Sequence, residues 1–433
     1  MLQIGALLLP PIYGARPTMY CDRVPMKNRI TLAAILVSAT LTVMAGAIVA
    51  PALNPMAAGL GVSPAAARLI ITTHAILIAV CSPFMGMAID AWGVRRPFAA
   101  GLIFYGLAGA SGLLAPGYWT IIAGRVALGV AVAAVYTAVT VSIFRLYSGA
   151  ERNKVMGWRA SSNALGGMVW PLLGGLLAGV AWRLPFSVYL IGIPLGLLVL
   201  TQLPTAETGD AAADEAEAAP DEAEAAGGIS GAGGTAGTSS ATSVLELFRS
   251  TRVLFVTYAI MFVTMLLLYS VVVFMPSLLK EMGSDTPIGV GGMLAVSAVA
   301  AGAMAALYGR IRARLPYPSI ISIALTAWIV GFLIIAVAPN IPLVALGVAL
   351  FGAGQGLALP SAMVWSGESV PPKFQGRITS YLATFGFVAQ FVSPLLLSPV
   401  SGALGVSGMY MVVSAAMAMA LGAWLAGWQL SRS

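Results

Sequence analysis

Twelve runs of apolar residues, each long enough to cross a lipid bilayer, occupy most of this 433-residue chain. A membrane-spanning helix needs about 20 predominantly apolar residues. Only 9% of the residues are charged and 59% are hydrophobic, whereas soluble proteins carry roughly 25% charged residues. The sequence therefore excludes a water-soluble globular protein and predicts an all-α polytopic membrane protein with 12 transmembrane helices. The runs are centred near Ala39, Ile76, Tyr105, Ala134, Gly167, Ile193, Thr264, Ser297, Thr326, Gly354, Phe387 and Met417.

The basic residues mark one side of the membrane. Short cytoplasmic loops carry an excess of Lys and Arg, and all but four of the 22 basic residues fall in one set of connections and in the two tails. The exceptions are Arg68, Arg125, Arg183 and Lys280. We therefore predict a multi-pass protein of the cell inner (plasma) membrane, with its N- and C-termini in the cytoplasm. The net charge of +7 reflects this asymmetry and contact with membrane lipid, and we expect no nucleic-acid partner.

One soluble segment separates the first six apolar runs from the last six. From Pro204 to Ser243 acidic residues precede a tract of Gly, Ser, Thr and Ala, a composition typical of a flexible linker. The predicted units are a disordered cytoplasmic extension over 1–28, an N-terminal six-helix bundle over 29–203, a cytoplasmic acidic and Gly-rich linker over 204–249, and a C-terminal six-helix bundle over 250–430.

The two halves resemble each other in sequence. Trp170-Pro171-Leu-Leu in the fifth run matches Ser393-Pro394-Leu-Leu in the eleventh. Parallel repeats of six spans are typical of transporters that bind substrate between the halves near the bilayer midplane. We therefore expect a site between the bundles that opens alternately to the two sides.

Three motifs of the first half resemble those of a known family. Residues 86–96 read Gly-x3-Asp-x2-Gly-x-Arg-Arg and resemble the loop between spans two and three of the major facilitator superfamily. Arg125-x3-Gly129 resembles its fourth-span motif, and residues 166–175 are similar to the fifth-span motif of its drug:proton antiporters. The resemblance covers the chain from Met26. It implies the major facilitator fold, in which two pseudo-symmetric six-helix bundles surround a central site.

The fifth-span motif is predicted to make the contact between the two bundles flexible. Prolines inside helices remove hydrogen bonds and produce kinks. In this chain Trp170 stands where the antiporters have Gly, and we expect it either to obstruct close helix approach or to line the cavity. The predicted helix-kink motif comprises Gly167, Pro171, Gly174, Gly175 and Pro394.

Arg125 is the charge predicted to lie deepest in the membrane. If span four begins near Tyr118, Arg125 lies about 10 Å further along at 1.5 Å per residue. A charge at the centre of a span costs about 2.5–3.5 kcal/mol on insertion scales. We therefore expect Arg125 to serve the cavity, with extension of its side chain to the outer interface as the alternative.

His74 is the only histidine and falls in the middle of the second run. Its unperturbed pKa of about 6.5 suits a proton carrier, whereas a packed neutral histidine bonded to a backbone carbonyl is the alternative. No Asp or Glu lies in the centre of a predicted span. If protons drive transport, then Arg125, His74, Asp90 or Glu368 must participate.

Charged residues at the cytoplasmic helix ends form a predicted gate. Asp90 can pair with Arg95, Arg96 or a basic residue of a neighbouring loop, so that it latches the halves together; a simple topology-setting charge cluster is the alternative. Glu368 and Arg377 form a second predicted charge network, for which solvated loop charges are the alternative. The predicted gating motif comprises Gly86, Asp90, Gly93, Arg95, Arg96, Glu368 and Arg377.

The remaining candidates are polar and aromatic residues in the middle of spans, which we expect to face a wet cavity rather than lipid. The predicted substrate and proton pathway comprises Arg125, His74, Asn54, Tyr136, Asn163, Trp170, Gln355, Trp365 and Gln390.

The sequence therefore predicts a secondary active transporter, a monomer that exports a drug-like or amphipathic small molecule in exchange for protons. The alternative is a symporter or facilitator for uptake of an organic anion, bound by Arg125, or of another small solute. We expect no enzymatic activity, no cofactor and no metal site.

Overall fold

The computed structural model describes residues 26–147, 149–203, 252–284, 286–370 and 372–430, and every regular element in these ranges is helical. The predicted linker and nearly all of the predicted N-terminal extension lie outside the described residues. The N-terminal bundle contains α1 (Met26–Ala47), η1 (Ala50–Ala52), α2 (Leu53–Leu60), α3 (Pro64–Trp92), α4 (Arg95–Ala110), η2 (Ser111–Leu113), α5 (Tyr118–Leu146), α6 (Gly149–Val180), η3 (Leu184–Ile191) and α7 (Gly192–Gln202). The C-terminal bundle contains α10 (Arg252–Glu281), α11 (Pro287–Arg312), α12 (Tyr317–Val337), α13 (Ile341–Glu368) and α14 (Pro372–Leu430).

The all-α membrane fold is confirmed. Ten helices within the described residues are long and apolar enough to cross a membrane. Two features account for the shortfall from twelve. Helix α4 has only 16 residues before it continues into η2, and α14 consists of two helices joined at Gly405, whose φ is +71°. The count of twelve crossings stays a prediction.

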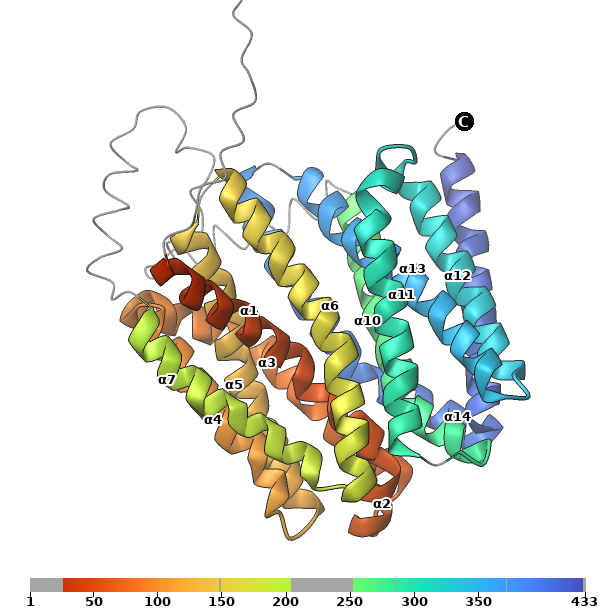
Figure 1. The fold of residues 1–433 in the computed structure, drawn as a ribbon. Coiled ribbons are helices and arrows are strands. Elements are labelled where there is room, and N and C mark those ends of the chain that lie inside the picture. Colours follow the sequence, from red (N-terminus) through yellow and green to blue (C-terminus); the bar gives the residue numbers. More distant parts are fainter. Residues whose placement is uncertain (1–25, 148, 204–251, 285, 371, 431–433) are drawn as a thin grey trace, which may run out of the picture.

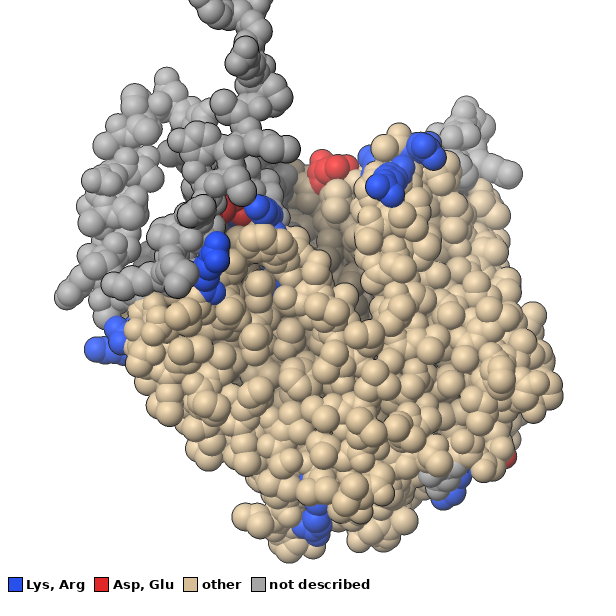
Figure 2. Space-filling model, in the orientation of Figure 1, with Lys and Arg blue, Asp and Glu red and all other residues tan. Residues whose placement is uncertain are grey.

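The two bundles lie side by side and meet along two helix pairs (Figure 1). Helix α6 packs against α11, and α3 packs against α14. One end of the molecule, here called the basic end, is where α3, α5 and α11 finish, and it carries Arg145, Arg152, Arg310 and Arg312. Figure 2 shows the surface hollowed between the two bundles at this end. The other end is called the opposite end below.

Glycines permit the close helix contacts inside the C-terminal bundle. A Cβ added to Gly352 of α13 would lie 2.2 Å from the carbonyl oxygen of Ser297 in α11. One turn further, a Cβ on Gly356 would lie 2.2 Å from the carbonyl oxygen of Ala301. Small residues at such positions let backbones approach closely, which is how helices associate in a lipid solvent that supplies no hydrophobic force between them.

The substitution Gly352→Ala is expected to destabilise the protein by about 1–3 kcal/mol, because its methyl group would push α13 away from the α11 backbone. The measurement is the melting temperature of the purified protein in detergent. Gly367 of α13 is the matched control, because a Cβ there meets nothing within 4 Å. Gly367→Ala should leave the melting temperature unchanged or raised, since Ala is the better helix former. Equal melting temperatures for the two variants would contradict the packing argument.

Candidate functional site

Arg125 is enclosed by the N-terminal bundle, with 2% of its surface exposed. Its Nη1 donates to the carbonyl oxygen of Ala45 (3.0 Å) and to Oη of Tyr189 (2.8 Å). The guanidinium carbon lies 5.2 Å from the ring centroid of Phe186 and 5.4 Å from that of Tyr189. The carbonyl of Ala45 is available because it belongs to the last turn of α1, where carbonyls lack partners within the helix. The Arg125 side chain therefore connects α5 to α1 and η3, and it does not extend to the outer membrane interface.

His74 lies beside this charge, at the contact with the C-terminal bundle. Its Cε1 and the Oη of Tyr269 in α10 lie 3.1 and 2.9 Å from the position that a Cβ on Gly46 would occupy. Both side chains therefore approach α1 at the same residue, Gly46, which has no side chain of its own. His74 is 2% exposed, so the imidazole and the guanidinium of Arg125 are both buried in this region. We call His74, Arg125, Tyr189 and Tyr269 the arginine–histidine cluster.

The fourth-span motif builds this cluster from one helix face. Arg125 binds the end of α1, and Gly129, one turn further along α5, faces α3. A Cβ on Gly129 would lie 2.6 Å from the carbonyl oxygen of His74. The glycine thus lets α5 approach the α3 backbone at the turn that carries the histidine.

Direct contacts hold the two bundles together at the opposite end. Arg68 of α3 is 6% exposed, and its guanidinium donates to the hydroxyl groups of Ser277 (3.1 Å), Ser398 (3.4 Å) and Ser401 (3.5 Å) of the C-terminal bundle. It also lies 4.1 Å from the ring centroid of Phe274. The predicted pathway residue Asn54 acts at the same end, where its Nδ2 donates to the carbonyl oxygen of Pro276 (2.7 Å).

A second group of predicted residues lies between the cluster and the basic end. Tyr136 of α5 makes an edge-to-face contact with Phe387 of α14, with ring centroids 5.5 Å apart. Arg159 of α6 lies over the same tyrosine ring at 5.3 Å, and its Nη1 donates to Oγ1 of Thr140 (3.0 Å). Asn163 follows one turn later on α6, and its Oδ1 is buried without a partner among the described residues. These side chains line the contact between the bundles.

The other predicted pathway residues pack within or beside the bundles. Trp170 donates from Nε1 to the carbonyl oxygen of Thr40 (3.1 Å) and so fills the space between α6 and α1. Gln355 donates to the carbonyl oxygen of Thr264 (2.9 Å), and Gln390 lies 3.6 Å from Sδ of Met265.

The fifth-span motif lies at the seam between the bundles. A Cβ on Gly174 would lie 2.0 Å from the carbonyl oxygen of Ile48, and one on Gly175 would lie 2.6 Å from that of Pro287. A Cβ on Gly167 would lie 3.4 Å from Cβ of Ala298. The motif therefore brings α6 close to α1 on one face and to α11 on the other. Pro171 lies inside α6 and Pro394 inside α14, and a kink at either proline stays a prediction.

The predicted cytoplasmic latch is engaged within one bundle rather than between the two. Oδ1 of Asp90 lies 3.7 Å from Nη2 of Arg145, and both side chains are about half exposed. Arg95 instead donates to the carbonyl oxygen of Leu200, and Arg96 is exposed. The turn itself requires glycine, because φ of Gly93 is +73°. No close contact explains Gly86, since a Cβ there would meet nothing within 4 Å.

The second charge network is also local to its bundle. Oε2 of Glu368 accepts a hydrogen bond from Oη of Tyr317 (2.7 Å) and lies 3.8 Å from Nη2 of Arg312. Trp365 stacks on Tyr317 with ring centroids 5.1 Å apart, which places it in this network rather than on the wall between the bundles. The side chain of Arg377 lies outside the described part of the structure.

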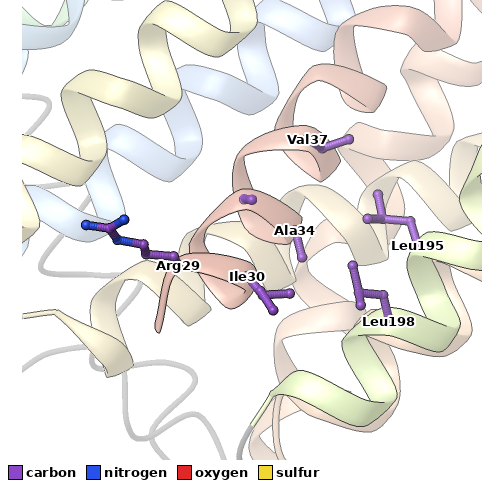
Figure 3. A pocket seen from close by; sticks show the side chains of 7 residues that line it. Arg29, Ile30, Ala34, Val37, Leu195 and Leu198 are labelled. Carbon is purple, nitrogen blue, oxygen red and sulfur yellow. The ribbon is translucent and has the colours of Figure 1, made fainter. Parts of the chain in front are cut away.

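A separate pocket lies on the surface of the N-terminal bundle between α1 and α7 (Figure 3). Its volume is about 290 Å³, and its walls are almost entirely aliphatic. Ile30 and Val37 are 48% and 40% exposed, and the guanidinium of Arg29 is turned away from Leu195 and Leu198 (Figure 3). The pocket resembles a lipid-facing groove rather than a transport site.

Comparison with known proteins decides the family. The model of the Major Facilitator Superfamily matches residues 35–394. This chain belongs to the major facilitator superfamily. Its fold resembles that of a bacterial homolog of the human lysosomal transporter Spinster in an inward-facing, occupied conformation, with a TM-score of 0.72 at 14% identity, covering 93% of this chain and 97% of the other.

Curated relatives in the superfamily carry exporter and resistance names. The chain is 33% identical over 171 residues to the puromycin resistance protein pur8 of Streptomyces alboniger, and 31% identical over 169 residues to the bacillibactin exporter of Bacillus subtilis (strain 168). The matches cover 39% and 37% of this chain, and 33% and 41% of the respective relatives. This chain is thus a multi-pass membrane protein of a transporter family.

Four residues of this superfamily member gained a role only from the structure. In the sequence, Tyr189 and Tyr269 are aromatic residues within apolar runs and have no distinguishing neighbours. Arg159 was assigned to a cytoplasmic connection between two spans. Arg68 was one of the four basic residues outside the predicted cytoplasmic segments, and this position was its one signal in the sequence. Their partners come from distant segments, so spacing along the chain does not reveal them.

The substitution Arg125→Lys is expected to abolish transport by this major facilitator protein. A lysine lacks the planar guanidinium that reaches both the Ala45 carbonyl and the Tyr189 hydroxyl while lying against the Phe186 and Tyr189 rings. Losing a hydrogen bond to a charged group costs about 1.5–3 kcal/mol. The measurement is transport in membrane vesicles at equal protein level. Arg183→Lys is the matched control, because Arg183 also binds two carbonyls (Leu113 and Ala115) but near a loop. Equal activity of both variants would remove Arg125 from the mechanism.

The substitution Arg68→Ala is expected to open the opposite end. Losing its serine contacts should shift the balance between closed and open forms by about 1–2 kcal/mol, a factor of roughly 5–30. The measurement is the distance between spin labels at Ala65 and Ala403, placed in a Cys21→Ser, Cys81→Ser background. We expect a longer-distance population to appear. Lys280→Ala, which removes an exposed charge at the same end, should leave the distances unchanged; identical distances for the Arg68 variant would rule out this closure.

Proposed function

We propose that this chain is a proton-coupled exporter of drug-like or amphipathic organic compounds across the plasma membrane. Membership of the major facilitator superfamily and the exporter and resistance names of its relatives support export as the class of activity. The basic end faces the cytoplasm in this proposal, because Lys and Arg accumulate on cytoplasmic loops. The described state is then closed toward the outside and open toward the cytoplasm.

The arginine–histidine cluster is the observation that carries the proton coupling. Histidine is the side chain whose unperturbed charge change falls between pH 5 and 8, and His74 lies where α3 meets Tyr269 of the other bundle. Protonation would place a second positive charge beside Arg125. The resulting repulsion would act on the contacts that join α1, α3 and α5 to α10, so a proton could bias the position of one bundle against the other.

The alternation between states requires the closure at the opposite end to break. In the outward-open state Arg68 must leave the serines of α10 and α14, and Asn54 must leave the carbonyl of Pro276. Hydrogen bonds between neutral hydroxyls and a guanidinium exchange readily with water once the end opens. These hydrogen bonds therefore stabilise the state in which the opposite end is closed, and their exchange with water permits the outward-open state.

The transport experiment uses inside-out membrane vesicles with an acidified lumen and three fluorescent probes: anionic dansyl-glycine, neutral dansyl-glycinamide and cationic dansylcadaverine. A proton-coupled exporter should accumulate at least one of them in the lumen, and collapse of the pH gradient should abolish the accumulation. Accumulation only when the external medium is the acidic side would favour an uptake symporter. Vesicles from cells lacking the protein are the control.

The substitution His74→Gln is expected to flatten the pH dependence of transport between pH 5.5 and 8 while preserving facilitated movement of the probe down its own gradient. Glutamine keeps hydrogen-bonding capacity but carries no titratable proton. Initial rates measured across this pH range provide the test. Thr73→Ser, one residue away in α3, is the control and should keep the profile of the unmodified protein. An unchanged profile in the His74 variant would exclude it as the proton carrier.

A further inference from the structure

Arg159 is a cation in the contact region between the bundles. It lies ten residues after the start of α6, and its partner Thr140 lies six residues before the end of α5. At 1.5 Å per residue, Thr140 is about 9 Å inside the end of its helix. Arg159 is only partly buried, and the surface between the bundles is hollowed at the basic end (Figure 2). A solute entering from that end would meet this charge before it met the cluster.

The contacts of Arg159 leave its positive charge without a counter-ion. Its partners are a neutral hydroxyl, that of Thr140, and the face of the Tyr136 ring. No carboxylate pairs with it in the part of the chain that the structure describes. A charge within the membrane is costly unless it is paired or wet, and such residues mark substrate pathways.

The other two arginines near the bundle contact also lack a carboxylate partner among the described residues, but both are more fully enclosed than Arg159. Arg125 is 2% exposed and is bound within the N-terminal bundle, and Arg68 is 6% exposed and held by serines at the opposite end. Neither guanidinium is presented to the hollow at the basic end. Arg159 is therefore better placed than Arg125 to receive an anion from that side.

The surroundings of Arg159 add two further requirements for a ligand. Tyr136 and Phe387 present an aromatic wall built from both bundles, with ring centroids 5.5 Å apart, which suits an apolar or aromatic body. Asn163, four residues along the same helix face, has a buried Oδ1 without a partner among the described residues. An amide carbonyl only accepts hydrogen bonds, so it calls for an N–H or O–H group on the ligand.

We propose that Arg159, Asn163 and Tyr136, with Phe387 opposite, form the binding site for an amphipathic organic anion that carries an aromatic or apolar body and a hydrogen-bond donor. This inference rests on the proposed export function and specifies its substrate class. Arg159 binds the anionic group as a charge-assisted pair, the rings contact the apolar body, and Asn163 accepts from the donor. Because the rings come from both bundles, a bound anion contacts both.

The test is binding of the three dansyl probes to the purified full-length protein, followed by probe fluorescence. Dansyl-glycine and dansyl-glycinamide differ only in the carboxylate, and both carry the sulfonamide N–H. The unmodified protein should bind dansyl-glycine about tenfold or more tightly than the amide, since charge-assisted bonds are about twice as strong as neutral ones. It should bind dansylcadaverine most weakly.

Variants assign this preference to the site. Arg159→Gln should bring the affinities for dansyl-glycine and the amide within about twofold, and Arg159→Lys should retain part of the preference because it keeps the charge. Arg152→Gln is the matched control: this arginine lies on the same helix nearer the basic end, over the ring of Phe144 at 5.1 Å, and its loss should leave the preference intact. Melting temperatures confirm that the variants fold.

The outcomes separate this inference from the proposed function. If the unmodified protein does not distinguish dansyl-glycine from its amide, or if Arg159→Gln keeps the full preference, the anion site is wrong. Vesicle accumulation of all three probes to the same extent would refute the anion site and leave the exporter standing. Failure of every probe to accumulate in vesicles would refute the exporter, and the inference with it.

Discussion

The cost of placing a charge in the membrane organises this transporter. A charged side chain inside the bilayer must be paired, hydrogen-bonded or wet, and three interior arginines meet this demand in different ways. Nη1 of Arg125 donates to a carbonyl and a phenol of its own bundle, whereas its Nε and Nη2 are buried without a partner among the described residues. Arg68 donates from Nη1 and Nη2 to hydroxyls of the other bundle. Arg159 donates to a hydroxyl of its own bundle but is only partly buried, at the hollowed end. One charge therefore stabilises a bundle, one closes an end, and one is left for a ligand.

The end of α1 connects these charges to bundle movement. Because α1 stops at Ala47 and continues as a 3-10 turn, the carbonyl of Ala45 is free to bind both Arg125 and Tyr189. The next residue, Gly46, leaves room beside α1 for the side chains of both His74 and Tyr269. A displacement of α10 relative to the N-terminal bundle must move Tyr269 away from this point. The end of α1 thus brings the titratable side chain of His74 and a side chain of the other bundle to the same residue, Gly46.

The fold could be predicted from the sequence because each span must satisfy its backbone internally, so hydropathy alone marks nearly every helix. Arg125 and His74 could also be singled out as candidates, since a charge and an imidazole stand out in apolar runs. It could not assign partners. Tyr189 lies 64 residues from Arg125 along the chain, and the pairing of Asp90 with Arg145 rather than Arg95 depends on how α3 and α5 pack. Arg159 was missed because helix α6 begins at Gly149, earlier than its apolar run.

The position of Arg159 also bears on how a substrate would promote the change of state. Closing the basic end removes water from around this guanidinium, and burying an isolated charge costs several kcal/mol. With an organic anion bound beside Arg159, closure buries an ion pair instead, whose mutual attraction offsets part of that cost. A ligand shifts an equilibrium only by its differential affinity for the two states. Arg159 supplies such a difference in affinity. Its charge is solvated while the basic end is open, and it loses that solvation when the end closes, so the anion stabilises the closed end more than the open end.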